Sequence, residues 1–158
     1  MIKLRPTCAA DEPFLYGLFC NTQSDQFASL DLPADQQEQL LKMQFGAQQQ
    51  QYRNQFPDAD FDVILDDAEP IGNLYALRGP ESYVLIDISL LKEHRNSGIG
   101  AVLVGALIAR AHGAGESLHA HVLKQSRAWR LWQRMGFELV DDDGVYFSIA
   151  NPTATICK

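Results

Sequence analysis

Cysteine is scarce in this sequence, and its spacing builds neither a disulfide framework nor a zinc site. The three cysteines, Cys8, Cys20 and Cys157, are odd in number and widely separated. Small secreted domains pair their cysteines densely, and structural zinc sites hold them at short fixed spacings. The pattern therefore favours a protein of the reducing cytoplasm and gives no sign of a bound metal.

The chain also lacks long apolar runs and an excess of positive charge. Residues 1–13 do not resemble a signal peptide, and no segment approaches the roughly 20 apolar residues of a membrane span. The sequence contains thirteen Lys and Arg and twenty Asp and Glu, which gives a formal net charge of −7. Such a chain has no general affinity for nucleic acid or anionic membranes, although it tolerates a cationic substrate. We expect neither nucleic acid nor membrane as a partner.

The remaining composition is that of a globular domain. Hydrophobic residues make up 46% of the 158 residues, charged residues make up 21%, and no internal repeat is present. This length supports one core. We predict a single domain over residues 1–150 and a loose C-terminal tail over 151–158.

Apolar periodicity and turn residues predict an alternating order of strands and helices. The expected helices begin at residues 11–13, cover 33–52, run from 98–100 to 113–115, and cover 125–135, with a polar loop at 21–29. The expected strands cover 2–5, 61–65, 71–77, 83–90 and 117–123, one begins at 137, and the last covers 145–149. This order predicts an α/β domain with a mixed sheet.

The most informative stretch runs from Leu85 to Ala111 and predicts a strand, a basic loop, a glycine turn and a helix. Gly98 and Gly100 stand where the helix begins. The first N–H groups of a helix have no partner within it, and the helix dipole adds partial positive charge there. Because glycine has no side chain, a phosphate could approach this backbone closely. The junction therefore predicts an anion site.

Three kinds of phosphate loop can be compared with this junction. A Walker loop requires a lysine after its last glycine, and none follows Gly100. A dinucleotide fingerprint requires a third glycine where Leu103 stands, which weakens that interpretation. The pattern Arg/Gln-x-x-Gly-x-Gly/Ala fits residues 95–100 at every fixed position. It resembles the pyrophosphate loop of the GNAT superfamily of N-acetyltransferases.

A second motif strengthens the resemblance. Residues 125–137, QSRAWRLWQRMGF, are similar to the family pattern Asn-x-x-Ala-x-x-Leu-Tyr-x-x-x-Gly-Phe, with Gln125 in place of Asn and Trp132 in place of Tyr. The predicted element order also matches the family over nearly the whole chain. The resemblance implies a GNAT fold: a mixed central sheet of about seven strands flanked by about four helices, with a splayed parallel strand pair.

The resemblance further implies acetyl-CoA as cofactor, with its pantetheine arm between the splayed strands and its pyrophosphate on the loop. Carried over residue by residue, the implied cofactor-binding positions are Ile88, Ser89, Leu90, Arg95, Asn96, Ser97, Gly98, Ile99, Gly100, Ala101, Gln125 and Trp132. The implied reaction is transfer of the acetyl group to a primary amine of a small molecule or peptide. Edge strands at both ends of such a sheet are compatible with a homodimer.

Two residues are candidates for the general base that this reaction needs. Asp87 lies within an apolar strand, where burial raises the pKa of a carboxyl group. A structural role, bonded to backbone or to an arginine, fits Asp87 equally well. His121 titrates near neutral pH on the expected partner strand and is the second candidate.

The general acid is missing from the motif. The family often uses a tyrosine where Trp132 stands, and an indole cannot release its proton at accessible pH. Either another group or water protonates the leaving thiolate, or catalysis has been lost. A non-catalytic coenzyme A-binding or regulatory module is therefore the alternative function.

Two further patterns have an ordinary explanation that we favour. His119 and His121 lie on one side of a strand and could ligate a metal, but no third ligand is close in sequence. The glutamines 48–51 could line a substrate groove with Phe45 and Tyr52 as walls. Good helix formers on a solvated helix surface explain the same glutamines unaided.

Overall fold

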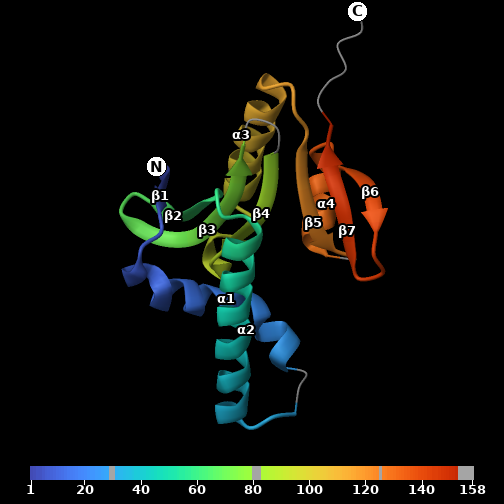
Figure 1. Ribbon diagram of the computed structural model, residues 1–158. Coiled ribbons are helices and arrows are strands. Elements are labelled where there is room, and N and C mark those ends of the chain that lie inside the picture. The colour runs from blue at the N-terminus through green and yellow to red at the C-terminus, as the bar shows by residue number, and fades with distance from the viewer. Residues whose placement is uncertain (29–30, 80–82, 125, 153–158) are drawn as a thin grey trace, which may run out of the picture.

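The computed structural model describes residues 1–28, 31–79, 83–124 and 126–152. Within these ranges lie four α-helices, two single-turn helices and seven strands (Figure 1). The helices are α1 (Glu12–Ala28), α2 (Ala34–Gln55), α3 (Ile99–Gly113) and α4 (Arg127–Arg134), with short turns η1 (Ala9–Asp11) and η2 (Lys92–His94). The strands are β1 (Ile2–Pro6), β2 (Asp60–Asp66), β3 (Glu69–Arg78), β4 (Tyr83–Leu90), β5 (Leu118–Leu123), β6 (Glu138–Asp142) and β7 (Tyr146–Asn151). The predicted α/β class is confirmed.

All seven strands form one sheet in the order β1-β2-β3-β4-β5-β7-β6. Every neighbouring pair is antiparallel except β4 and β5, which are parallel and joined through α3. Parallel neighbours need such a crossover because the chain must return to the same end of the sheet. The predicted mixed sheet, with its one parallel pair at the centre, is confirmed.

A β-bulge in β4 separates this parallel pair after only three residue pairs. In β3, Tyr75 pairs with Asp87 while the next residue, Ala76, pairs with Leu85, so Ile86 is an extra residue in β4. A bulge bends its strand and increases the local twist. The pairing of β4 with β5 ends at Leu85 and Ala120, directly before the bulge. Beyond it the two strands diverge (Figure 1), as the splayed pair was predicted to do.

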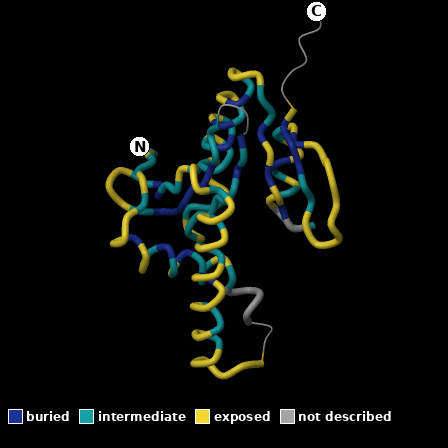
Figure 2. The backbone as a smooth tube through the Cα atoms, viewed as in Figure 1, coloured by how far each residue is buried: buried dark blue, intermediate teal, exposed yellow. Residues whose placement is uncertain are grey.

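The hydrophobic core lies on the face of the sheet that α3 and α4 cover. It joins β3 and β4 to β5 and β7, and Figure 2 shows the central strands as the most buried backbone. Its fully buried members include Ile64, Ile71, Val104, Leu118 and Ile149. None of the described helices combines the length and apolar character needed to span a lipid bilayer.

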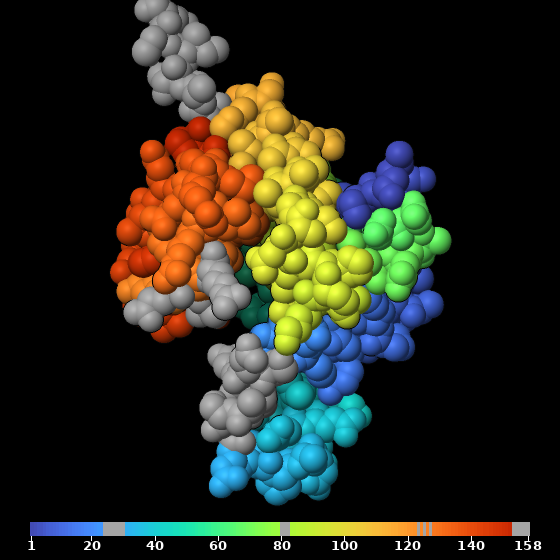
Figure 3. Space-filling model, turned by 180° about the vertical axis from the view of Figure 1, so that it is seen from behind, coloured from blue at the N-terminus to red at the C-terminus, as the bar shows by residue number. Residues whose placement is uncertain are grey.

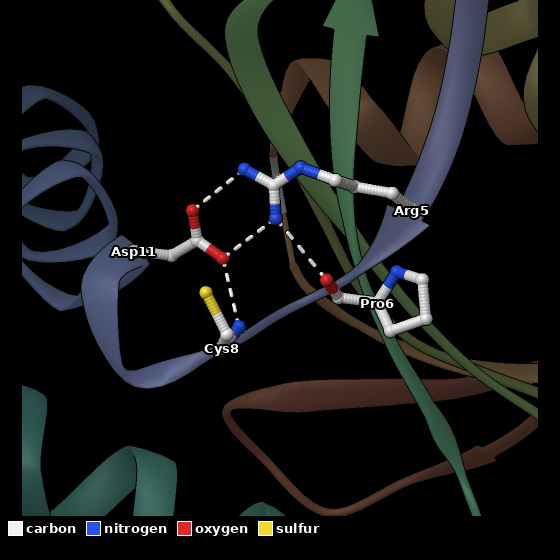
Figure 4. Close-up of polar contacts among 4 residues, drawn as sticks. All are labelled: Arg5, Pro6, Cys8 and Asp11. Carbon is white, nitrogen blue, oxygen red and sulfur yellow. Dashed lines mark hydrogen bonds and ion pairs between the residues drawn. The ribbon is translucent and has the colours of Figure 1, made fainter.

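A bidentate ion pair joins η1, the turn directly before α1, to β1 (Figure 4). Both terminal nitrogens of Arg5 donate to the Asp11 carboxylate at 2.8 Å, and the Cys8 backbone N–H donates to Asp11 Oδ2 at 2.8 Å. The Asp11 side chain is 8% exposed and that of Arg5 is 39% exposed, so solvent screens the pair from the Arg5 side. These bonds hold the pKa of Asp11 well below its usual range, with the hydrogen bonds from Arg5 as the largest cause.

Replacing Asp11 by asparagine should destabilise the fold at neutral pH. We expect the free energy of unfolding to fall by about 1–3 kcal/mol, because the variant loses the charge that Arg5 and the Cys8 N–H bond. A carboxyl group whose pKa is lower in the folded state stabilises above its unfolded pKa of about 3.9 and loses that contribution as pH falls through the folded value. Urea titrations at pH 7 and pH 3 should therefore show a smaller difference at pH 3.

The exposed Asp58 offers a matched control for this substitution. Asp58→Asn should change stability by less than about 0.5 kcal/mol at either pH. An equal loss in both variants, or a difference that does not shrink in acid, would contradict the role of Asp11.

The structure corrects two boundaries predicted from the sequence. The loop expected at 21–29 is helical through residue 28, because polar residues without Gly or Pro continue a helix when a tertiary contact holds it. That contact is Asn21 Oδ1, which accepts hydrogen bonds from the Lys92 N–H and from Arg95. Asn151, expected in the loose tail, is a buried residue of β7 whose Nδ2 donates to Met135 O at 2.8 Å. Pro152 follows the strand, and residues 153–158 of the expected tail lie outside the described residues.

Candidate active site

Four polar side chains of β3 and β4 stand together on the sheet face that α1 and α2 cover. The register pairs Asn73 with Ser89 and Tyr75 with Asp87, so these residues share one face. Asn73 Nδ2 donates to Asp87 Oδ2 at 3.0 Å, and Asn73 is only 4% exposed. Buried polar groups of this kind need partners, and Asn73 and Ser89 find theirs in the Asp87 carboxylate.

A small pocket lies between this polar group and the two N-terminal helices. Its described lining comes from α1, α2, β3 and β4: Leu15, Leu18, Phe19, Thr22, Gln23, Phe45, Gln48, Gln49, Asn73, Tyr75, Asp87 and Ser89. The Tyr75 hydroxyl donates to Gln49 Oε1 at 3.3 Å across it. The pocket therefore combines aromatic walls with neutral polar groups and a single carboxylate.

Burial raises the pKa of Asp87 above its ordinary value, although hydrogen bonds from Asn73, Ser89 and the Ile88 N–H act in the opposite direction. Burial, followed by the nearby Asp87 charge, also raises the pKa of Tyr75 to about 12. The pKa of Tyr52 is raised for the same two reasons in the same order. At neutral pH both phenols stay protonated, while the pKa of Asp87 moves toward the range useful for a base.

The edge of β4 that faces the gap carries backbone groups without a strand partner. The Leu91 N–H donates to Ile71 O of β3 at 2.9 Å. Because successive residues of an antiparallel strand point to opposite edges, the backbone groups of Ile88 and Leu90 point toward β5. Pairing with β5 has already ended at Leu85. The Ile88 N–H already bonds the Asp87 carboxylate and Leu90 O accepts from Arg95, so Ile88 O and the Leu90 N–H are the groups on this edge that a ligand lying along the gap could meet.

The loop between β4 and α3 forms an open cradle at one end of this gap. Gly98 is the residue before α3 and has φ of 87°, which favours glycine. The first helical bond runs from the Val102 N–H to Gly98 O, so the N–H groups of residues 99–101 have no helical partner. A Cβ built at Gly98 or Gly100 would meet no atom within 4 Å. Seen from behind, the surface is hollowed between the yellow start of α3 and the orange region around α4 (Figure 3).

Arg95 reaches back from this loop to β4 and α1. Its Nε donates to Leu90 O at 2.9 Å, and one terminal nitrogen donates to Asn21 Oδ1 at 3.0 Å. The guanidinium therefore joins the loop to the end of β4 and to the helix that lines the pocket.

Comparison with known proteins identifies the family. The family model described as "Acetyltransferase (GNAT) family" matches residues 22–137, most of the chain. The chain belongs to the GNAT acetyltransferase family. The cofactor of this family is acetyl-CoA, as predicted. No curated protein matches the sequence.

Solved structures share the GNAT fold at low sequence identity. The PaiA N-acetyltransferase from Thermoplasma acidophilum, in complex with coenzyme A, aligns with a TM-score of 0.71 and 18% identity over 96% of this chain and 99% of its own. An acetyltransferase from Thermus thermophilus aligns with a TM-score of 0.68 and 22% identity over 95% of each chain. A GNAT family acetyltransferase from Elizabethkingia anophelis with acetyl-CoA bound aligns with a TM-score of 0.56 and 17% identity over 94% of this chain and 96% of its own.

The predicted site residues lie in different places. Asp87 and Ser89 line the pocket, and the loop residues 95–101 form the cradle. His121 is exposed on β5, near Asp143, and is absent from the described pocket lining. Trp132 is 5% exposed and packs in the core with Phe137, at 6.1 Å between ring centroids. Gln125 lies outside the described residues.

The uncharged polar residues that line the pocket were not identified from the sequence. Asn73 and Tyr75 were assigned only to an expected strand, although a polar Asn within an apolar strand signals a buried hydrogen bond. Among the glutamines 48–51, Gln48 and Gln49 line the pocket, whereas residues 50 and 51 are exposed. The prediction of a solvated surface therefore fails for the first two, because α2 packs them toward the sheet. In the described ranges, no cluster of His, Cys, Asp or Glu could hold a metal.

Proposed function

We propose that this chain transfers the acetyl group of acetyl-CoA to a primary amine of a small molecule or peptide bound in the pocket. The observation that carries this proposal is the position of Asp87. Its carboxylate lies in the pocket wall and belongs to β4. One edge of β4 pairs with β3, and the other edge faces the gap beside β5. A base at this junction would reach an acceptor from the pocket side while the cofactor lies along the gap.

The residues of the cradle and the gap fit acetyl-CoA. The backbone of Asn96–Ala101, open where Cβ atoms would stand at Gly98 and Gly100, would receive the pyrophosphate with Arg95 beside it. Ile88 O and the Leu90 N–H would pair with the pantetheine amides. When bound, acetyl-CoA supplies an acetyl group activated as a thioester.

The chain's own groups would then handle charge and protons. Asp87 removes a proton from the amine, directly or through water. A backbone N–H on the gap edge of β4 stabilises negative charge on the carbonyl oxygen. Tyr75, with its pKa raised to about 12, is a poor acid toward a thiolate, whose conjugate thiol has a pKa of about 8.5. We therefore infer that the proton that Asp87 takes from the amine passes through water to the leaving thiolate, and that neither Tyr75 nor Trp132 supplies it.

A thiol-release assay with acetyl-CoA and a panel of primary amines tests the proposal. We expect release that depends on one class of amine and saturates with it. Release from no member of a panel of diamines, aminoglycosides, amino acids and peptides, despite tight binding of coenzyme A, would instead support the non-catalytic binding module. Trp132 favours that alternative, because it replaces the family's usual acid and lies in the core.

Under the catalytic proposal, Trp132 contributes packing and no proton. Trp132→Phe should keep kcat within about tenfold, equivalent to roughly 1.4 kcal/mol. Trp132→Ala should lower the free energy of unfolding by about 3–5 kcal/mol, through the cavity it leaves in a well-packed core. Steady-state kinetics against pH and urea titrations measure the two effects.

Trp129 provides the matched control on the same helix. It is half-buried and packs against Phe147 at 5.4 Å between ring centroids. Trp129→Phe should resemble Trp132→Phe in kcat. A thousandfold loss of kcat for Trp132→Phe alone, with normal acetyl-CoA binding, would show that the indole N–H takes part in the chemistry.

A further inference from the structure

We propose that the pocket accepts amines that are cationic and carry no anionic group, such as linear diamines, and rejects amines that also bear a carboxylate. This inference rests on the proposed function and names its acceptor class. It follows from the charges, walls and neighbours of the pocket.

The described lining holds one carboxylate, Asp87, and no basic side chain. Its other polar members are amides and hydroxyls, whose oxygens can accept hydrogen bonds from an ammonium group. Phe19 and Phe45, with ring centroids 5.7 Å apart, form an aromatic wall. Aromatic faces attract cations, so wall and carboxylate favour the same kind of ligand.

Two arginines close to this lining have other partners. Arg95 donates to Leu90 O and to Asn21. Arg53 lies over the ring of Phe61 at 4.6 Å and lines a neighbouring pocket, which shares Leu15, Phe45 and Gln49 with this one. Its charge reaches the Tyr75 phenol but only offsets part of the rise in that pKa.

An acceptor with a carboxylate would therefore place a second negative charge beside Asp87 in a pocket whose described lining offers no counter-ion. Burying an unpaired charge is costly, and a like charge nearby adds to that cost. A protonated amine would instead place a positive charge beside the Asp87 carboxylate, which attracts it. The net charge of −7 also draws cations toward the molecule as a whole.

Cadaverine and lysine test the inference because lysine is cadaverine with one added carboxylate. We expect kcat/KM for cadaverine to exceed that for lysine by at least about a hundredfold. Lysine methyl ester, which keeps the bulk but removes the charge, should recover most of the difference. If lysine equals or surpasses cadaverine, the inference is wrong; if the ester is as poor as lysine, size rather than charge selects and it is wrong too.

A charge introduced into the wall should reverse the preference. Gln48 is half-buried in the lining, so Gln48→Arg should lower kcat/KM for cadaverine and raise that for lysine. Gln51→Arg places the same charge on the exposed side of α2 and should leave the ratio nearly unchanged. Equal effects of the two variants would show that overall charge, and not the pocket, sets the preference.

Calorimetry separates this inference from the proposed function. Cadaverine and lysine are titrated into wild-type protein saturated with coenzyme A. If acetyl transfer fails with every amine, cadaverine should still bind and lysine should not. Binding of lysine as tight as that of cadaverine, or binding of neither, would overturn the inference whatever the outcome of the transfer assay.

Discussion

Gly100→Glu should abolish coenzyme A binding while leaving the fold intact. A Cβ at Gly100 meets no protein atom within 4 Å, so the added side chain finds room in the folded chain. That room is the space in which the pyrophosphate would meet the first N–H groups of α3, and a carboxylate there adds repulsion. Calorimetry should therefore show no binding by a variant whose circular dichroism and unfolding midpoint are close to those of the wild type.

Two companion variants sharpen this test. Gly113→Glu makes the same change at the other end of α3, where a Cβ also meets nothing, and should bind coenzyme A normally. Gly100→Ala should weaken binding less than glutamate does, and alanine favours the helix by about 1 kcal/mol. Unchanged affinity in a folded Gly100→Glu protein would place the cofactor's phosphates elsewhere.

Asp87→Asn should lower kcat by roughly 10²–10⁴-fold with little change in coenzyme A affinity. Asparagine keeps the size of the side chain but cannot accept the amine proton. In the wild type, activity should fall as pH drops through the pKa of Asp87, which burial raises above the ordinary value. This acid limb of kcat against pH should be absent from the residual activity of Asp87→Asn.

The free energy of unfolding of Asp87→Asn should not fall with its kcat, so measuring both separates a catalytic role of Asp87 from a structural one. A carboxyl group whose pKa is raised in the folded state favours folding when protonated and loses that contribution as pH rises through the folded pKa. At neutral pH, Asp87→Asn should therefore be as stable as the wild type or more so.

The matched control is Asp62→Asn on β2. The pKa of Asp62 is also raised, chiefly by burial, but Asp62 lies outside the described pocket lining. Its variant should keep full activity. If Asp87→Asn loses stability and little activity, Asp87 is structural and His121 becomes the candidate base.

The fold, and the glycine turn that we propose as the cofactor cradle, could be predicted because their signals are local. The glycines at 98 and 100 stand close together in sequence with the strand before them and the helix after them. Strand order followed from resemblance and from the crossover that a parallel pair requires.

The pocket that we propose for the acceptor could not be predicted, because it depends on register and on packing between distant elements. Asn73 meets Asp87 only when β3 and β4 pair in one particular register, interrupted by a bulge. Gln49 reaches Tyr75 only because α2 lies across the sheet. The helical continuation of α1 past Asn21 likewise depends on Arg95, which lies 74 residues further along the chain.

The extra residue in β4 sets the chemistry of the two halves of that strand. Before Ile86, the odd-numbered Tyr83 and Leu85 belong to the core; after it, the even-numbered Ile88 and Leu90 pack there. The bulge therefore changes which alternate residues of β4 face the core, from the odd-numbered to the even-numbered ones. An uninterrupted strand would turn the Asp87 carboxylate into the apolar core and would lose the bend that separates β4 from β5. Both halves of the proposed reaction centre, the base and the space for the thioester, therefore depend on one inserted residue whose own side chain need take no part in either.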